Sequence, residues 1–213
     1  MYKQLHKFVG NIMRDFTLLK AQMFEKDKYQ VFLEIEKVKK QVECQQTLSE
    51  AYNLISALRA TSHLNGDIAE LGTFKGGSAK LIQTFKRKDK KLHLFDTWEG
   101  IPANSEGFTK EQFAASFEDV KRFIGDDACF HKGYFPQTTT EEATYSFVHL
   151  DGDIQQSIYD GLNYFYPRME KGGIIIIHDW GLMGVKLAFF SYFKDRQPMT
   201  FSHGTQAMVI KYA

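Results

Sequence analysis

Residues 66–81, with the sequence GDIAELGTFKGGSAKL, constrain the fold of this chain more than any other segment. The segment begins as a short apolar strand, passes the acidic Glu70 and then Gly72, and opens a helix after a glycine pair. A glycine turn between a strand and a helix lets a ligand approach the backbone closely, and the first N–H groups of the helix point at that ligand. The segment therefore predicts a binding site for a nucleotide-like ligand.

Length and charge limit the classes of protein to consider. A chain of 213 residues is long enough for one well-buried core and short for two full domains. Its formal net charge of +1 gives no electrostatic reason to expect a nucleic acid or an anionic membrane as partner. No segment approaches the roughly 20 apolar residues of a membrane span. The two cysteines, Cys44 and Cys129, stand outside any CxxC pattern, which fits a reduced, cytoplasmic compartment.

The first 62 residues differ in pattern from the rest of the chain. Apolar residues recur there every third or fourth position, as in Leu5, Phe8, Ile12 and Phe16, which predicts helices. Two interpretations stay open for this N-terminal helical extension: a layer packed on the core, or a lid or oligomerisation arm. We expect a homo-oligomer, with these helices as candidates for its contacts, and we assign residues 63–213 to the catalytic domain.

From residue 66 onward, predicted strands alternate with predicted helices. This order predicts a mostly parallel α/β sheet with helices on both faces. Four consecutive isoleucines at 174–177 are typical of a central strand buried on both sides. The last two strands follow one another without a helix and predict an antiparallel C-terminal hairpin, with His203 in its turn. The expected strands are 68–71, 92–95, 128–132, 145–150, 174–177, 199–202 and 207–212, and the expected helices are 78–85, 110–123, 154–166 and 184–196.

Acidic or imidazole side chains stand at the end of four of these strands. They are Glu70, Asp96, Asp151 and the pair His178-Asp179. Ligands of an open α/β sheet bind beyond the carboxyl ends of its strands, so we expect these side chains to gather on one rim. Asp153 follows closely and is read either as a supporting residue of that rim or as a helix N-cap.

The chemistry of this rim favours S-adenosylmethionine (SAM) over NAD as the ligand. Asp96 lies 24 residues after Gly72 and can accept hydrogen bonds from a ribose, although an Asx turn is the alternative. The segment GTFKGGSA lacks the GxGxxG fingerprint that holds a pyrophosphate. Glu70 would repel a diphosphate but suits a ligand with an ammonium or sulfonium charge.

Several segments together resemble one known family. They are GDIAELGTFKGGSAKLI, LHLFDTWEGIP, ACFHKGYFPQTT, YSFVHLDGDIQQSIYDGLNYFYPRMEKGGIIIIHDW and the closing TQAMVIKY. They are similar to the TylF/macrocin O-methyltransferase family, whose members are class I, SAM-dependent enzymes that act on sugar hydroxyls of macrolides and aminocoumarins. The resemblance runs from about Gln46 to the C-terminus. It implies a Rossmann-like fold, SAM as cofactor, and a small-molecule or glycan acceptor.

The resemblance also implies a role for individual residues. Asp151 matches an acid that in the family is both a magnesium ligand and the presumed general base. The residues expected to hold the methionine part of SAM are Glu70, Gly72, Gly76, Gly77 and Ser78. The residues expected around the ribose and adenine are Asp96, Thr97, Trp98, Gly133 and Phe135, with Asp151 next to the cofactor.

This chain departs from the family where two aspartates usually complete the metal site, because it has His178-Asp179 instead. Three possibilities stay open. Mg²⁺ binds through Asp151 and Asp179 with His178 turned aside; Mn²⁺ or Fe²⁺, which accept imidazole more readily, occupy the site; or the site holds no metal and His178 is the base.

The leading hypothesis is a SAM-dependent O-methyltransferase that acts on a hydroxyl of a sugar, a glycosylated metabolite or a polysaccharide. The alternatives are an NAD-type oxidoreductase and a cofactor-binding scaffold without catalysis. Among the remaining conspicuous residues, His149 is expected to be a hydrogen-bonded core histidine. The aromatic residues Phe108, Phe113 and Phe117 are expected in the core, and residues 99–109 are expected to form a cover over the cofactor.

Overall fold

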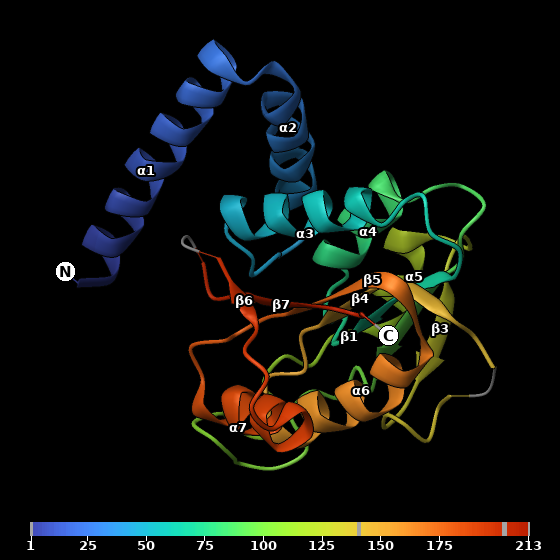
Figure 1. The fold of residues 1–213 in the computed structure, drawn as a ribbon. Coiled ribbons are helices and arrows are strands. Elements are labelled where there is room, and N and C mark those ends of the chain that lie inside the picture. Colours follow the sequence, from blue (N-terminus) through green and yellow to red (C-terminus); the bar gives the residue numbers. More distant parts are fainter. Residues whose placement is uncertain (1, 140–141, 202–203, 213) are drawn as a thin grey trace.

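The structure is a computed structural model that describes residues 2–139, 142–201 and 204–212. It is an α/β fold around one seven-stranded sheet (Figure 1). The helices are α1 Tyr2–Phe24, α2 Lys26–Gln41, α3 Leu48–Ala60, α4 Gly77–Phe85, α5 Phe117–Ile124, α6 Gln155–Arg168 and α7 Met183–Phe193. The strands are β1 Asp67–Leu71, β2 Leu92–Asp96, β3 Cys129–Lys132, β4 Tyr145–Leu150, β5 Met169–Ile177, β6 Met199–Thr200 and β7 Ala207–Ile210.

The strand order is β3-β2-β1-β4-β5-β7-β6. Strands β1 to β5 pair in parallel, whereas β7 is antiparallel to both β5 and β6. The predicted parallel sheet and its antiparallel C-terminal edge are therefore confirmed. The chain leaves β1 toward β2 and β3, then returns to β4 on the other side of β1. This reversal opens a crevice between the carboxyl ends of β1 and β4, where ligands of such sheets bind.

The sheet is covered on both faces, with α3, α4 and α5 on one side and α6 and α7 on the other (Figure 1). The isoleucine run of β5 serves both cores, because successive side chains of a strand point to opposite faces. Ile174 and Ile176 pack with α3, α4 and α5, whereas Ile175 and Ile177 pack with α6 and α7. A strand buried on both sides needs apolar residues at every position, which explains the unbroken run.

The three N-terminal helices differ in how closely they join this body. Helix α3 contributes Leu54 and Leu58 to the core on the sheet, and α2 packs on α3 and α4 through Phe32 and Ile35. Helix α1 projects from the body (Figure 1). Large apolar side chains exposed along it are Val9, Ile12, Met13, Phe16, Leu19, Met23 and Phe24. Homo-oligomerisation stays a prediction. Across the described residues, no helix has both the length and the hydrophobicity needed to cross a membrane.

The largest difference from the predicted elements lies in residues 100–116. A helix was expected over 110–123, but α5 begins only at Phe117, with Ser116 as its N-cap. The preceding residues turn repeatedly, and Glu106, Gly107 and Glu111 have positive φ angles that a helix does not permit. Strand β5 is longer than predicted, and β6 and β7 are shorter. Ser202 and His203 of the expected hairpin lie outside the described residues.

Candidate active site

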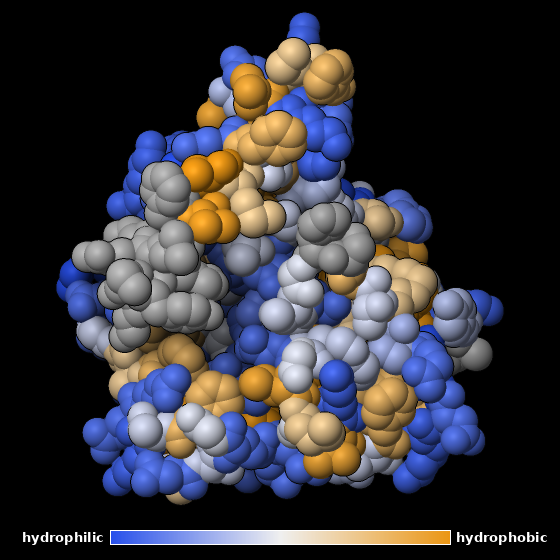
Figure 2. Space-filling view, turned by 90° about the vertical axis from the view of Figure 1, so that its left-hand side faces the viewer, coloured by the Kyte–Doolittle hydropathy of each residue, from blue (hydrophilic) through white to orange (hydrophobic). Residues whose placement is uncertain are grey.

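The ends of the strands meet at a cavity of 610 Å³. Figure 2 shows the molecule hollowed on one side, with hydrophilic residues inside the hollow. A cavity of this volume is typical of a cofactor or small-molecule site. The predicted site residues that line it are Gly72, Gly77, Ser78, Asp96, Thr97, Gly133, Phe135, Asp151, His178 and Asp179. Three other predicted residues, Glu70, Gly76 and Trp98, are not among its lining residues.

Gly72 brings the ends of β1 and β4 together. The N–H of Asp151 donates to the carbonyl of Leu71 at 2.8 Å, so the two strand ends remain paired as they enter the cavity. The φ angle of Gly72 is +89°, and a Cβ on it would lie 2.0 Å from the carbonyl oxygen of Asp151. Backbone atoms cannot move aside as a flexible side chain can. Glycine is therefore required here both by conformation and by space.

Asp96 shapes the glycine turn from the end of β2. One carboxylate oxygen accepts the N–H groups of Thr73 at 2.8 Å and Phe74 at 2.7 Å, and the other accepts the N–H of Trp98 at 2.7 Å. Burial raises the pKa of Asp96, against the effect of these hydrogen bonds. The Asx-turn interpretation is thus confirmed. Each carboxylate oxygen can accept a further hydrogen bond, and the contact with a ribose stays a prediction.

Glu70 begins a buried chain of hydrogen bonds beside the cavity, which runs through His149 to Gln46. Its side chain is fully buried, and its Oε1 lies 2.9 Å from Nδ1 of His149. The other ring nitrogen of His149 lies 3.2 Å from Nε2 of Gln46, so His149 is a hydrogen-bonded core histidine, as expected. Burial raises the pKa of Glu70, although the hydrogen bond from His149 opposes this effect. Gln46 itself lines the cavity, and its Oε1 has no hydrogen-bond partner within the described part of the chain.

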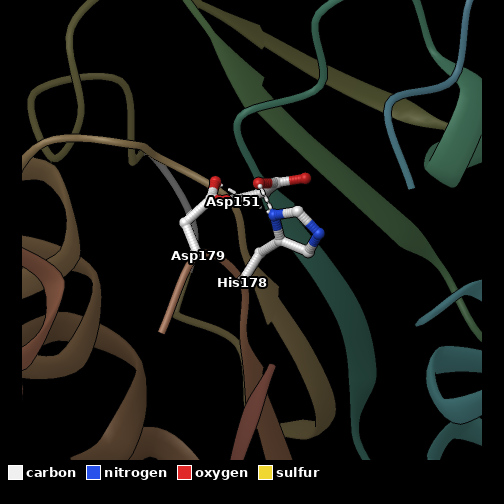
Figure 3. A group of neighbouring side chains, drawn as sticks. All are labelled: Asp151, His178 and Asp179. Carbon is white, nitrogen blue, oxygen red and sulfur yellow. Dashed lines mark ion pairs between the residues drawn. The ribbon is translucent and has the colours of Figure 1, made fainter. Parts of the chain in front are cut away.

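Asp151, His178 and Asp179 form a compact cluster in the cavity wall (Figure 3). Nδ1 of His178 lies 3.1 Å from Oδ1 of Asp151 and 3.0 Å from Oδ2 of Asp179. His178 is therefore turned toward the two carboxylates rather than aside. Burial by itself lowers the pKa of His178, but the charge of Asp151 and the contacts with Asp151, Asp179 and Glu50 together outweigh it and raise this pKa far above its usual range. The same pairing holds the pKa of Asp151 below its usual value despite burial.

Asp153 lies two residues beyond Asp151 in an unusual conformation. Its φ angle is +60°, which is uncommon for a residue other than glycine and is frequent at functional sites. The N-cap of α6 is Ile154, so the interpretation of Asp153 as the N-cap is wrong. Asp153 instead lines the cavity, and burial together with Asp151 and Asp179 raises its pKa to about 8.

Residues 99–116 cover the cavity. Phe108 and Phe113 line it instead of packing in the main core, so their predicted place was wrong, whereas Phe117 does pack on the core. The carboxylate of Glu106 accepts the N–H of Gln155 at 3.0 Å and so caps the first turn of α6. A Cβ on Gly184 would lie 1.8 Å from Oε2 of Glu106, so glycine leaves room for this contact. The hydrogen bond from Gln155 thus ties this segment to the start of α6.

Both tryptophans pack against phenylalanines and are not among the lining residues of the cavity. Trp98 is buried against Phe117, with ring centroids 4.7 Å apart, and its Nε1 donates to the carbonyl of Phe74 at 3.1 Å. Trp180 packs edge-on against Phe189. Both tryptophans therefore pack at strand ends.

The N-terminal residues of the site were not found from the sequence. Gln46, Thr47 and Glu50 line the cavity, and they belong to the start of α3 and the segment before it. One local signal was available, because Thr47 and Glu50 have the T-x-x-E spacing of a capping box. That spacing predicts a helix start, but it does not place this helix start against the ends of β1 and β5.

Comparison with known proteins agrees with this geometry. The family model for macrocin-O-methyltransferase (TylF) matches residues 13–203. Demethyldecarbamoylnovobiocin O-methyltransferase of Streptomyces niveus is 26% identical over 142 residues, covering 56% of this chain and 54% of that protein. The 8-demethyl-8-(2,3-dimethoxy-alpha-L-rhamnosyl)-tetracenomycin-C 4'-O-methyltransferase of Streptomyces olivaceus is 27% identical over 150 residues, covering 60% and 58%. The match thus spans little more than half the length of these two curated relatives.

The fold has counterparts among solved structures. The O-methyltransferase NovP superposes with a TM-score of 0.68 at 21% identity, covering 78% of this chain and 81% of NovP. That similarity identifies the Rossmann-like fold of class I methyltransferases. The family model covers far more than half of the residues. The chain belongs to the macrocin O-methyltransferase (TylF) family.

Proposed function

We propose that this protein is a SAM-dependent O-methyltransferase that methylates a hydroxyl of a sugar or glycosylated metabolite with the help of a divalent metal ion. The observation that carries the proposal is the Asp151–His178–Asp179 cluster, which opens into the same cavity as Asp96 and the glycine turn. This arrangement brings a cofactor site and a proton-accepting, metal-binding site within one enclosed volume. The S. olivaceus relative is named for a tetracenomycin that carries a rhamnosyl group, which supports a glycosylated acceptor for this chain.

The cofactor end of the cavity suits SAM. Gly77 and Ser78 open α4 at the wall, where the helix dipole favours a carboxylate such as that of a methionine moiety. The orphaned Oε1 of Gln46 is a buried acceptor that suits an ammonium group. Glu70 adds negative charge close behind this wall. Its place as a direct cofactor ligand, and those of Gly76 and Trp98, remain predictions, as does the adenine contact of Gly133 and Phe135.

The Asp151–His178–Asp179 cluster fits a divalent metal ion. Ligand atoms at adjacent corners of an octahedron with bonds of about 2.1 Å lie about 3.0 Å apart, close to the 3.0 and 3.1 Å from Nδ1 of His178 to the two carboxylates. Nδ1 also makes no hydrogen bond of good geometry with any described residue. An imidazole that faces the ligand point favours Mn²⁺ or Fe²⁺ over Mg²⁺. Mg²⁺ remains a prediction.

The chain's own residues then position and deprotonate the acceptor. A bound divalent ion would stabilise negative charge on the acceptor oxygen. With SAM bound, Asp151 or His178 would receive the hydroxyl proton while the acceptor oxygen takes the methyl group, the methyl–sulfur bond breaks and S-adenosylhomocysteine leaves. The cover formed by Phe108 and Phe113 excludes water from the cavity. Holding the two reactants in line within this volume supplies much of the rate enhancement.

A titration distinguishes this function from the NAD-type alternative. We expect S-adenosylhomocysteine (SAH) to bind the purified protein in isothermal titration calorimetry, with one site per chain and no comparable heat from NADH. The physical reason is the missing pyrophosphate nest and the negative charge of Glu70. Binding of NADH with no binding of SAH would reverse the assignment. Binding of SAH without methyl transfer to any acceptor would favour the scaffold without catalysis.

The charge of the cavity predicts which acceptors it takes. Seven acidic residues line it, and none of the described lining residues is a lysine or arginine; the acids are Glu43, Glu50, Asp96, Asp151, Asp153, Asp160 and Asp179. We therefore expect p-nitrophenyl α-L-rhamnoside to be methylated with a kcat/KM at least about tenfold above that of TDP-rhamnose, because the diphosphate is repelled. The difference is expected to shrink as NaCl rises. Equal or better use of TDP-rhamnose would refute this expectation.

A further inference from the structure

Glu50 is a buried carboxylate held by two separate segments. Its Oε2 accepts the N–H and hydroxyl of Thr47, both at 2.8 Å, which closes the capping box of α3. Its Oε1 accepts the N–H of Thr205 at 2.6 Å and the hydroxyl of Thr205 at 2.9 Å. Only 3% of Glu50 is exposed. The side chain therefore joins the start of α3 to the segment that leads into β7.

Glu50 also reaches the proposed metal cluster. Its Oε2 lies 3.9 Å from Nε2 of His178, the ring nitrogen that faces away from Asp151 and Asp179. This distance is a charge contact rather than a direct hydrogen bond. A second route runs through the backbone, because the carbonyl of Thr205 accepts the N–H of Trp180 at 2.7 Å, directly after Asp179. Glu50 is thus linked to His178 by a charge contact and to the backbone next to Asp179 through Thr205.

Capping of α3 by itself does not require the negative charge of Glu50. A capping box accepts Gln as well as Glu at this position. Within the described ranges, no lysine or arginine forms an ion pair with Glu50, so the only basic group beside it is His178. Burial by itself raises the pKa of Glu50, but the nearby His178 and the hydrogen bonds from Thr205 and Thr47 together hold this pKa well below its usual range. The buried carboxylate is therefore satisfied by donors from Thr47 and Thr205, and it faces His178 as a basic neighbour.

The surrounding chain leaves space for this side chain. Gly204 has a φ angle of +113°, and a Cβ on it would lie 2.6 Å from Cγ of Glu50. Histidines that bind metals commonly place their second ring nitrogen toward a carboxylate, which fixes the orientation of the ring. The contact between Glu50 and Nε2 of His178 has this arrangement.

We propose that Glu50 is a positioning residue that holds the His178 ring with Nδ1 toward Asp151 and Asp179 and thereby ties α3 to the metal site. The proposal rests on the metal site of the proposed function. It assigns to the N-terminal helices a part in building the active site. Removing the charge of Glu50 should therefore loosen the ring and weaken metal binding without removing the cofactor pocket.

The test compares Glu50→Gln with Asn53→Ala in the full chain. Gln keeps the size of Glu and one acceptor oxygen for the capping box. Asn53 donates to Oε1 of Gln206 at 3.3 Å, so its loss cuts another tie between α3 and this edge of the sheet without touching His178. Mn²⁺ binding is followed by electron paramagnetic resonance. We expect Glu50→Gln to weaken Mn²⁺ binding about tenfold or more, with the SAH dissociation constant within twofold of wild type, and Asn53→Ala to leave Mn²⁺ binding unchanged.

A second readout makes the outcome independent of the metal. The ¹⁵N–¹H signal of His178 Nε2 is recorded in the metal-free protein at one fixed pH. We expect an ordered signal in wild type and Asn53→Ala that is shifted or lost in Glu50→Gln. Unchanged signals in Glu50→Gln, or unchanged Mn²⁺ affinity where wild type binds the ion, would overturn the role of Glu50. If wild type bound no Mn²⁺, the proposed metal site would be refuted. The nitrogen signal of His178 alone would then decide whether Glu50 positions the ring.

Discussion

Asp151→Asn is expected to lower kcat for methyl transfer about 10³-fold, the typical size of a lost acid–base group. This loss corresponds to about 4 kcal/mol of activation free energy. The substitution keeps the shape of the side chain and removes the charge that faces Nδ1 of His178 at 3.1 Å. It thereby removes a proposed metal ligand and the proposed proton acceptor together. The measurement is transfer of a tritiated methyl group from SAM at saturating acceptor.

The matched control for this substitution is Asp160→Asn. Asp160 also lines the cavity, but its side chain accepts from Gln156 at 2.9 Å on the exposed surface of α6, and the carboxylates that pair with His178 are those of Glu50, Asp151 and Asp179. We expect Asp160→Asn to retain kcat within a few-fold, and Asp151→Asn to bind SAH less than tenfold more weakly than wild type. Full methyl transfer by a folded Asp151→Asn variant would remove Asp151 from the reaction.

Gly72→Ala is expected to destabilise the fold by about 3 kcal/mol and to abolish measurable SAH binding. The added Cβ would meet backbone atoms of Asp151 at 2.0 and 2.6 Å, so β1 and β4 must separate at the cavity. Overpacking of this kind costs about 1–3 kcal/mol, and the left-handed conformation adds about 1–2 kcal/mol for a residue with a Cβ. Urea unfolding measures the stability, and calorimetry measures SAH binding.

Gly107→Ala separates these two costs. Gly107 has the same φ angle of +89°, but a Cβ there would meet nothing within 4 Å. We expect Gly107→Ala to show only the conformational cost, about 1–2 kcal/mol, and to bind SAH. If Gly72→Ala were no worse than Gly107→Ala, the close approach of β1 and β4 at Gly72 would not be what builds the site.

The order of strands and helices could be predicted because each element has a local pattern of apolar residues. Alternating strands and helices imply a parallel sheet, and the run at 174–177 marks a strand buried on both faces. The placement of Phe108 and Phe113 could not be predicted in this way. Their spacing is compatible with a helix, and an aromatic side chain that faces a cavity has the same sequence signal as one in the core. Positive φ angles at Glu106 and Glu111 determine the local conformation. A glutamate in the sequence does not predict a positive φ angle.

The residues on the rim of the site could be predicted from the sequence, because parallel strands bring their carboxyl ends to one edge of the sheet. This rule placed Asp96, Asp151 and His178-Asp179 in one cavity. The rule could not predict the orientation of the His178 ring, because that orientation depends on the side chains that pack around the ring. It also could not find Gln46, whose contact with His149 joins residues 103 positions apart. Such contacts depend on how α3 packs against the sheet, which sequence spacing does not encode.

A crystal of the full chain grown with SAH and MnCl₂, measured at the manganese edge, tests the central claim most directly. We expect SAH in the cavity beside Gly72 and Asp96, and an anomalous peak within bonding distance of Asp151, Nδ1 of His178 and Asp179. The sulfur of SAH would face that peak. SAH bound elsewhere, or SAH in the cavity with no manganese at these three residues, would contradict a metal-assisted methyl transfer at this site.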